Sequence, residues 1–140
     1  MQLPKILHVT SKVKHADARG PYIRINPKYV KDAGILLRKN EHVRQWYITT
    51  FVLFIPYLLC AFAFVSWPWH VAAFIHCSLV YNLATKYIRR ARLKSEVLAF
   101  RAQLKHDSKH VFHLATVLAS SYNLGITTAT AIQLLKKEKE

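Results

Sequence analysis

Charged residues are missing from a long central part of this chain: residues 46–85 contain no Lys, Arg, Asp or Glu. A helix on the surface of a soluble protein keeps a charged face in water, so a stretch of this length without charge favours a lipid environment. Ser66, Trp67, Pro68 and Trp69 interrupt the stretch near its middle. The sequence therefore predicts a helical hairpin over residues 46–87 that inserts into a membrane, with its turn at residues 66–69.

Acidic residues, cysteine and glycine are also scarce, numbering 7, 2 and 3 among 140 residues. No acid lies within the predicted hairpin, so it lacks the buried carboxylate of a proton relay. Cys60 and Cys77 could meet across the hairpin in a disulfide, but we expect them to pack as small hydrophobic side chains. The sequence has no nucleophilic triad, glycine-rich phosphate loop or carboxylate pair, so we expect that the protein is not an enzyme.

The first arm of the hairpin, residues 46–65, is rich in Phe, Leu, Ile, Val and Ala. About twenty apolar residues are what a helix needs to cross ~30 Å of hydrocarbon. Apolar side chains face every direction around this arm, whereas a core helix of a soluble protein usually keeps a polar stripe. Pro56 predicts a kink rather than an end, because transmembrane helices tolerate proline.

The second arm, residues 69–87, is more polar, since it contains two histidines, a serine and an asparagine. We expect it to span the membrane with its polar side covered by a protein partner. Aromatic side chains mark both ends of the hairpin, where amphipathic rings settle at the level of the lipid headgroups. The predicted interface anchors are Trp46, Tyr47, Trp67, Trp69 and Tyr87.

The net charge of +14 is concentrated at the open end of the hairpin. Residues 1–45 carry ten Lys or Arg and three acids, and residues 86–110 carry eight and two. The positive-inside rule places both segments in the cytoplasm, matrix or stroma. The basic residues that follow the second arm also predict binding of anionic lipid. The predicted lipid-binding residues are Lys86, Arg89, Arg90, Arg92 and Lys94.

Residues 1–45 predict a basic arm followed by a surface helix. The arm, which extends to Ile25, shows no clear period, and Asn26 and Pro27 have the types preferred at an N-cap and a first helical position. Residues 1–16 are basic, contain hydroxyl side chains and lack acids, a composition that resembles mitochondrial import segments. A secretory signal peptide is not expected, because the first apolar stretch begins only at Trp46.

The segment at residues 88–110 has the most regular periodicity in the chain. Its apolar residues Leu93, Val97, Phe100 and Leu104 follow the spacing i, i+4, i+7, i+11, which aligns one face of a helix. Basic residues gather on the adjoining sector. The sequence therefore predicts a basic amphipathic helix that continues from the second arm.

Residues 111–140 predict a moderately apolar helix with a charged tail. Two alternatives remain for residues 111–135: a third transmembrane helix, or a helix buried or lying on the surface of the protein. Ser121, Gly125 and Ala129 are small residues at intervals of four, a pattern that lets helices approach closely in membranes. They form the predicted helix-packing face.

Five histidines are candidates for ligand binding. His106, His110 and His113 would share one helical face, but neither a cysteine nor a second carboxylate lies near them, so we expect them to act as weak cations. His70 and His76 lie in the second arm, where haem ligation would need partner ligands. We expect no cofactor other than a bound phospholipid such as cardiolipin.

These features predict an all-α integral membrane protein: a transmembrane helical hairpin with basic amphipathic flanking helices. In size and topology the chain resembles the accessory subunits of mitochondrial respiratory complexes and ATP synthase. This resemblance implies a noncatalytic structural subunit of a membrane-bound energy-transducing complex, with other membrane subunits and anionic lipids as partners. It also implies the mitochondrial inner membrane, with the N-terminus and residues 86–110 on the matrix side.

Other functions and locations remain as alternatives. The chain could be a free-standing membrane-shaping hairpin, or a small membrane redox subunit that uses a histidine as haem ligand. Another organelle or a bacterial inner membrane is an alternative location. Nucleic acid is not an expected partner, because the basic segments lack the interleaved aromatic residues of a base-stacking surface.

Overall fold

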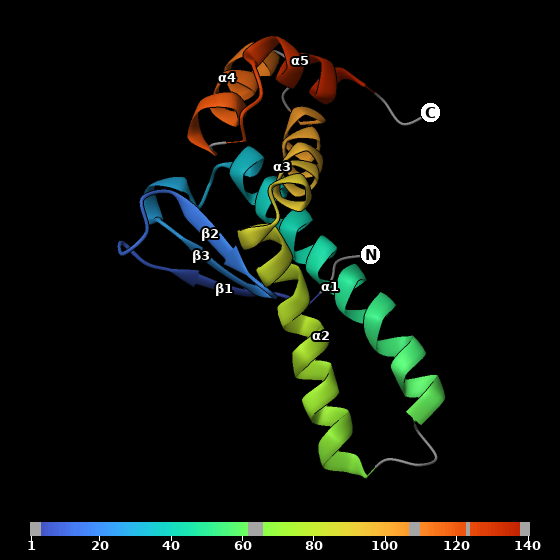
Figure 1. The fold of residues 1–140 in the computed structure, drawn as a ribbon. Helices are drawn as coiled ribbons and strands as arrows, with labels where there is room; N and C mark the ends of the chain where they lie inside the picture. The colour runs from blue at the N-terminus through green and yellow to red at the C-terminus, as the bar shows by residue number, and fades with distance from the viewer. Residues whose placement is uncertain (1–3, 62–65, 107–109, 123, 138–140) are drawn as a thin grey trace.

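The computed structural model describes residues 4–61, 66–106, 110–122 and 124–137 of the chain (Figure 1). The protein is mostly helical, as predicted, but the described residues also contain a three-stranded sheet that an all-α fold does not include. In chain order the elements are β1 (Ile6–Val9), β2 (Ala16–Arg19), β3 (Tyr22–Ile25), the 3-10 turn η1 (Pro27–Tyr29), α1 (Ala33–Ala61), α2 (Trp67–Tyr87), α3 (Arg89–Leu104), α4 (Val111–Ser121) and α5 (Thr128–Lys136).

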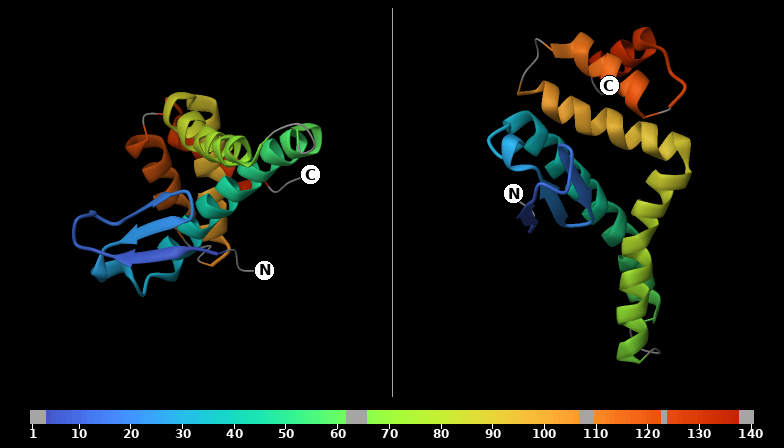
Figure 2. Two further views of the ribbon diagram at one scale, coloured as in Figure 1. Left: turned by 90° about the horizontal axis from the view of Figure 1, so that it is seen from below. Right: turned by 90° about the vertical axis from the view of Figure 1, so that its left-hand side faces the viewer.

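The sheet has the strand order β1-β3-β2, with β1 parallel and β2 antiparallel to β3. In the central strand β3, Ile23 and Ile25 alternate with half-buried residues and are completely buried. Gly20, in the turn between β2 and β3, has a φ of +59°, and a Cβ there would lie 3.2 Å from the Trp46 ring. The sheet therefore packs closely on the first half of α1, which Figure 2 shows running beside it.

Helices α1 and α2 form an antiparallel hairpin that projects away from the rest of the protein (Figures 1 and 2). Aromatic contacts join the two arms: the rings of Phe54 and Phe74 meet edge to face at 5.3 Å. Pro56 lies inside α1, which continues to Ala61. Helix α2 begins at Trp67, so Trp67 and Trp69 belong to its first turn and not to the connection; Pro68 suits that first turn because it needs no hydrogen-bonding N–H there.

The projecting half of the hairpin exposes large apolar side chains on both of its helices. Among the described residues, α1 is the one helix that is long and apolar enough to cross a membrane. Helix α2 has the length to do so but is diluted by polar residues such as His76 and Asn82. The large apolar residues exposed in this half are Phe51, Val52, Leu53, Ile55 and Leu59 on α1, and Trp67, Trp69, Val71, Ile75 and Leu79 on α2.

Helix α3 does not continue α2. The chain bends at Ile88, which is extended, and α3 runs across the open end of the hairpin (Figure 2). The face predicted from the spacing is correct: Val97 and Phe100 are buried, and Leu93 and Leu104 pack beside them. That face is covered by α4 and α5, so α3 buries its apolar side inside the protein.

Residues 111–135 form two short helices instead of the single helix predicted from composition. Helix α4 ends at Ser121, and α5 begins after Thr127, whose side chain accepts a hydrogen bond from the backbone N–H of Thr130. Gly125, between them, has a φ of +59°. Helices of 11 and 9 residues are each too short to cross ~30 Å of hydrocarbon, so the alternative of a third transmembrane helix over this segment is wrong.

Candidate functional site

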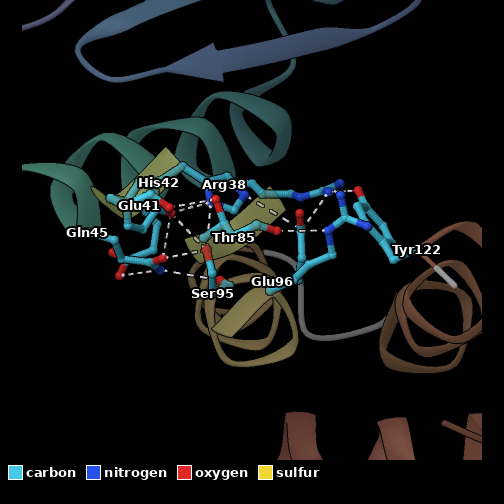
Figure 3. A network of polar contacts seen from close by, with 10 residues as sticks. Arg38, Glu41, His42, Gln45, Thr85, Ser95, Glu96 and Tyr122 are labelled. Carbon is cyan, nitrogen blue, oxygen red and sulfur yellow. Dashed lines mark hydrogen bonds and ion pairs between the residues drawn. The ribbon is translucent and has the colours of Figure 1, made fainter. Parts of the chain in front are cut away.

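A polar network lies at the base of the hairpin, where α1, α2 and α3 meet (Figure 3). Burying polar side chains costs free energy unless they are hydrogen-bonded. A hydrogen-bonded network of this size therefore fixes the relative positions of the helices that it joins. Its labelled members are Arg38, Glu41, His42 and Gln45 from α1, Thr85 from α2, Ser95 and Glu96 from α3, and Tyr122 after α4.

Glu96 is the anionic centre of this network. It accepts a hydrogen bond of 3.0 Å from Arg38 and lies 3.6 Å from Nε2 of His42. Burial by itself would raise the pKa of Glu96, but the hydrogen bond from His42 and the nearby positive charges lower it overall. Arg38 also donates to the Tyr122 hydroxyl and lies over the Phe100 ring. The pair of Arg38 and Glu96 therefore joins α1 to α3, and Arg38 also joins α1 to the end of α4.

Ser95 occupies the other half of the network and is only 6% exposed. Its hydroxyl donates to Oε1 of Gln45 at 2.7 Å and lies 2.8 Å from the Tyr81 hydroxyl and 3.2 Å from Nδ1 of His42. A serine, a histidine and a glutamate in contact resemble a hydrolase triad. The Ser95 hydroxyl is also shared with Gln45 and Tyr81, and it is only 6% exposed. These contacts tie three helices together.

A pocket of about 520 Å³ opens beside the network, between β2, α1 and the junction of α2 with α3. This volume is within the range of small-ligand sites. Its lining includes the basic residues Arg19, Lys39, Lys86 and Arg92, together with two acids, Asp17 and Glu96. The pocket thus combines four cationic side chains from three separate parts of the fold.

Both acids of the pocket are neutralised by arginines that lie outside its lining. Asp17 accepts two hydrogen bonds from Arg24, which lower the pKa of that carboxyl, and Glu96 pairs with Arg38. The lining therefore keeps an excess of positive charge. At Lys39, burial and the charge of Arg38 lower the pKa to about 8, the change expected when an ammonium group is poorly compensated.

The predicted lipid-binding residues divide into two groups. Lys86, Arg90 and Lys94 are exposed cations. By contrast, Nε of Arg89 donates to the carbonyl of Leu124 at 2.6 Å, and Nε of Arg92 donates to the carbonyl of Thr85 at 3.1 Å. Arg89, in the first turn of α3, therefore binds the connection that precedes α5. Arg92 is held beside the pocket by a carbonyl in the last turn of α2.

The predicted interface anchors also divide. Trp67, Trp69 and Tyr87 are exposed, with Trp67 at 75%, and their role as interface anchors stays a prediction. Trp46 is only 8% exposed, and its Nε1 donates to the carbonyl of Ser78 at 2.8 Å. Its assignment as a lipid-facing anchor is wrong, because the ring fills the space between the sheet, α1 and α2. Tyr47 is half-buried and donates to the carbonyl of Pro4.

The predicted packing face of small residues does not form one ladder. Ser121 ends α4, Gly125 lies in the connection and Ala129 lies in α5, and all three are exposed. The four-residue spacing aligns side chains only along a continuous helix, and the chain breaks after Ser121. Gly125 has a different role: a Cβ there would overlap the guanidinium of Arg89.

The histidines are dispersed in the same way. His106 follows the end of α3, His110 precedes α4 and His113 lies within α4, so these three do not share one helical face. Within residues 4–61, 66–106, 110–122 and 124–137, no three His, Cys, Asp or Glu side chains gather closely enough to hold a metal ion. His70 is buried against Tyr57, and His76 is exposed on the same helix.

Comparisons of the chain with family models, curated proteins and solved structures find no match. The hairpin and the pocket are therefore the two features from which a function can be inferred. The pocket could not be predicted from sequence, because Arg19, Lys39, Lys86 and Arg92 come together only through tertiary structure. The one sequence signal for it was the basic character of the segments on both sides of the hairpin.

Proposed function

We propose that the protein is a noncatalytic membrane-anchored structural subunit. The projecting half of the α1–α2 hairpin inserts into the bilayer, and the sheet together with α3, α4 and α5 forms a basic head at one membrane surface. The observation that carries this proposal is the exposure of large apolar side chains on the projecting half. Phe51, Val52 and Leu59 on α1, and Trp69 and Ile75 on α2, face outward from a two-helix hairpin that has no other described element beside it.

The charge distribution supports the orientation of this anchor. Basic residues surround the open end of the hairpin in the head, and the projecting half has none. The positive-inside rule then places the head in the cytoplasm, matrix or stroma. The polar residues of α2, including His76 and Asn82, are suited to contact with a neighbouring membrane helix. This supports a subunit that works within a larger assembly.

Two alternatives have less support. A membrane-shaping helix needs a free apolar face to wedge into one leaflet. The apolar face of α3 is instead buried by α4 and α5. A bis-histidine haem site would need two histidines that meet from different helices, but His70 and His76 lie on one helix, and His70 packs against Tyr57. The mitochondrial inner membrane and an energy-transducing host stay predictions.

Membrane insertion can be tested with the native Cys60, which is exposed near the end of α1. In a Cys77→Ala background reconstituted into liposomes, a water-soluble maleimide should label Cys60 only after detergent is added. The matched control is Ser11→Cys in a cysteine-free background, an exposed position in the head that should be labelled in leaky liposomes without detergent. Labelling of Cys60 in intact liposomes, together with release of the chain by alkaline carbonate, would contradict insertion.

The assembly is tested by native-gel separation of mild-detergent membranes and mass spectrometry of the band that contains the chain. Co-migration with a large membrane complex is expected and would name the host. Migration only as a small homo-oligomer would contradict the subunit proposal and favour the free-standing hairpin.

A further inference from the structure

We propose that the pocket at the base of the hairpin binds the phosphoryl group of an anionic lipid headgroup, with Lys39, Lys86 and Arg92 as its cationic contacts. This inference rests on the proposed membrane anchoring, which brings lipid to the pocket. It goes beyond a general attraction of basic helices to anionic membranes. It assigns one defined site, adds Lys39 to the predicted lipid-binding residues, and leaves Arg89, Arg90 and Lys94 outside the site.

The charge of the pocket is the first argument. The ion pairs of the described residues involve Arg19, Arg24, Arg38, His42 and Arg44, but not Lys39, Lys86 or Arg92. Asp17 and Glu96 line the same pocket, but their carboxylates are held by Arg24 and Arg38. A phosphoryl anion would supply the negative charge that the lining lacks.

Lys39 gives a second argument. Its position next to Arg38 in a half-buried environment lowers its pKa to about 8, which means that the fold tolerates its charge poorly. A bound anion would favour the ammonium form and offset the cost of its burial.

The position of the pocket is the third argument. Lys86 lies in the last turn of α2, Arg92 in the first turns of α3, and Lys39 on α1 two turns before Trp46. When the apolar half of the hairpin lies in hydrocarbon, these residues lie at the level of the headgroups. The acyl chains can then follow the exposed apolar face of α2, where Leu79 and Leu83 are exposed.

The test compares lipid retention between two exposed basic positions on neighbouring helices. Lys86 lines the pocket, whereas Arg90 does not, and both are exposed, so Lys86→Gln and Arg90→Gln remove the same charge. The proteins are reconstituted into phosphatidylcholine nanodiscs with a minor fraction of phosphatidylglycerol, and the retained lipid is measured by native mass spectrometry. The wild type and Arg90→Gln should retain one phosphatidylglycerol, and Lys86→Gln should retain about tenfold less.

Lys39→Gln and Lys39→Arg provide a second measurement at the more buried position. Lys39→Gln should lower retention to a similar extent, and Lys39→Arg should restore it in part, because the cation and not the side-chain packing is what the lipid needs. Circular dichroism confirms that each variant is folded. Equal losses in Lys86→Gln and Arg90→Gln would show bulk electrostatics and overturn the proposal, as would full retention in Lys39→Gln.

Two further measurements distinguish a lipid site from a site for a soluble phosphoryl compound, and failure of this inference from failure of the membrane anchor. Saturable binding of glycerol phosphate to protein in phosphatidylcholine nanodiscs, with the affinity of the lipid, would assign the pocket to a soluble phosphoryl compound and overturn the lipid assignment. Protection of Cys60 from maleimide is measured in the same nanodiscs. Protein that is protected but retains no phosphatidylglycerol contradicts this inference alone, whereas unprotected protein contradicts the membrane anchor.

Discussion

The guanidinium of Arg38 lies 4.0 Å from the centre of the Phe100 ring. This contact joins α1, which continues into the hairpin, to the apolar cluster beneath α3, α4 and α5. Cation–π contacts of this kind contribute about 1 kcal/mol when partly desolvated. Because Arg38 also donates to Glu96, a single side chain connects the apolar core of the head with the polar network.

The ion pair between Arg38 and Glu96 predicts a large effect of Glu96→Gln on stability. The substitution leaves the buried Arg38 without a carboxylate, which should lower the free energy of unfolding in detergent by about 3 kcal/mol. The control is Glu41→Gln: Glu41 is as buried as Glu96, but its partner Arg44 is half exposed, so water can solvate the cation and this substitution should cost less than Glu96→Gln. Chemical unfolding followed by circular dichroism measures both. Equal losses would contradict a structural role for Glu96.

Gly125→Ala should destabilise the C-terminal helices by about 1–2 kcal/mol, because φ at this residue is positive. The new Cβ would also displace Arg89, which then loses its hydrogen bond to Leu124. The double variant with Arg89→Ala should therefore cost less than the sum of the single variants. Thermal unfolding of all three proteins checks this. Additive effects would show that the two residues do not interact.

Lys39 predicts a rise in stability with alkaline pH. Its pKa is about 8 in the folded protein and 10.5 as an ordinary lysine, so between these values the unfolded chain holds a proton that the folded protein has released. Stability contributed by this group therefore increases from about pH 8 to pH 10.5. Lys39→Met should remove this increase. Unfolding midpoints measured at pH 7.5 and 9.5 for both proteins test the sign.

A charge on the lipid-facing surface should impair membrane insertion. Val52 is 63% exposed on the projecting half of α1, and a lysine near the middle of a span costs about 3 kcal/mol. Val52→Lys should reduce the fraction of chain that resists carbonate extraction. Leu37→Lys, at an exposed position of α1 within the head, should leave that fraction unchanged. Similar behaviour of the two variants would argue against a bilayer around the hairpin.

The predictions that follow local periodicity agree with the structure. The face of Val97 and Phe100 was predictable because a continuous helix aligns residues at three- and four-residue intervals. The hairpin followed from the absence of charge and from the interruption near Pro68. The first inference uses only residues within one helix, and the second uses only two helices joined by a short connection.

The features missed from sequence depend on contacts between distant residues. Strand β3 is only four residues long, so its alternation of apolar residues does not distinguish it from an irregular segment. It pairs in parallel with β1, although β2 lies between these two strands in the sequence. Trp46 has the residue type and the sequence position of an interfacial anchor. Its ring is buried because Gly20 packs against it and its Nε1 donates to the carbonyl of Ser78. The break after Ser121 is not evident from composition, because residues 111–135 contain no Lys, Arg, Asp or Glu that would mark an end of the helix.

The bend at Ile88 couples the orientation of the hairpin to the orientation of the head. A single residue separates α2 from α3, and α3 is packed against α1 on one side and against α4 and α5 on the other. In the proposed membrane-inserted arrangement, this single-residue connection means that the two arms cannot tilt in the bilayer without turning α3 with them. Hydrophobic helices adjust their tilt to the thickness of the surrounding membrane. A change in bilayer thickness would therefore rotate the basic head relative to the membrane surface.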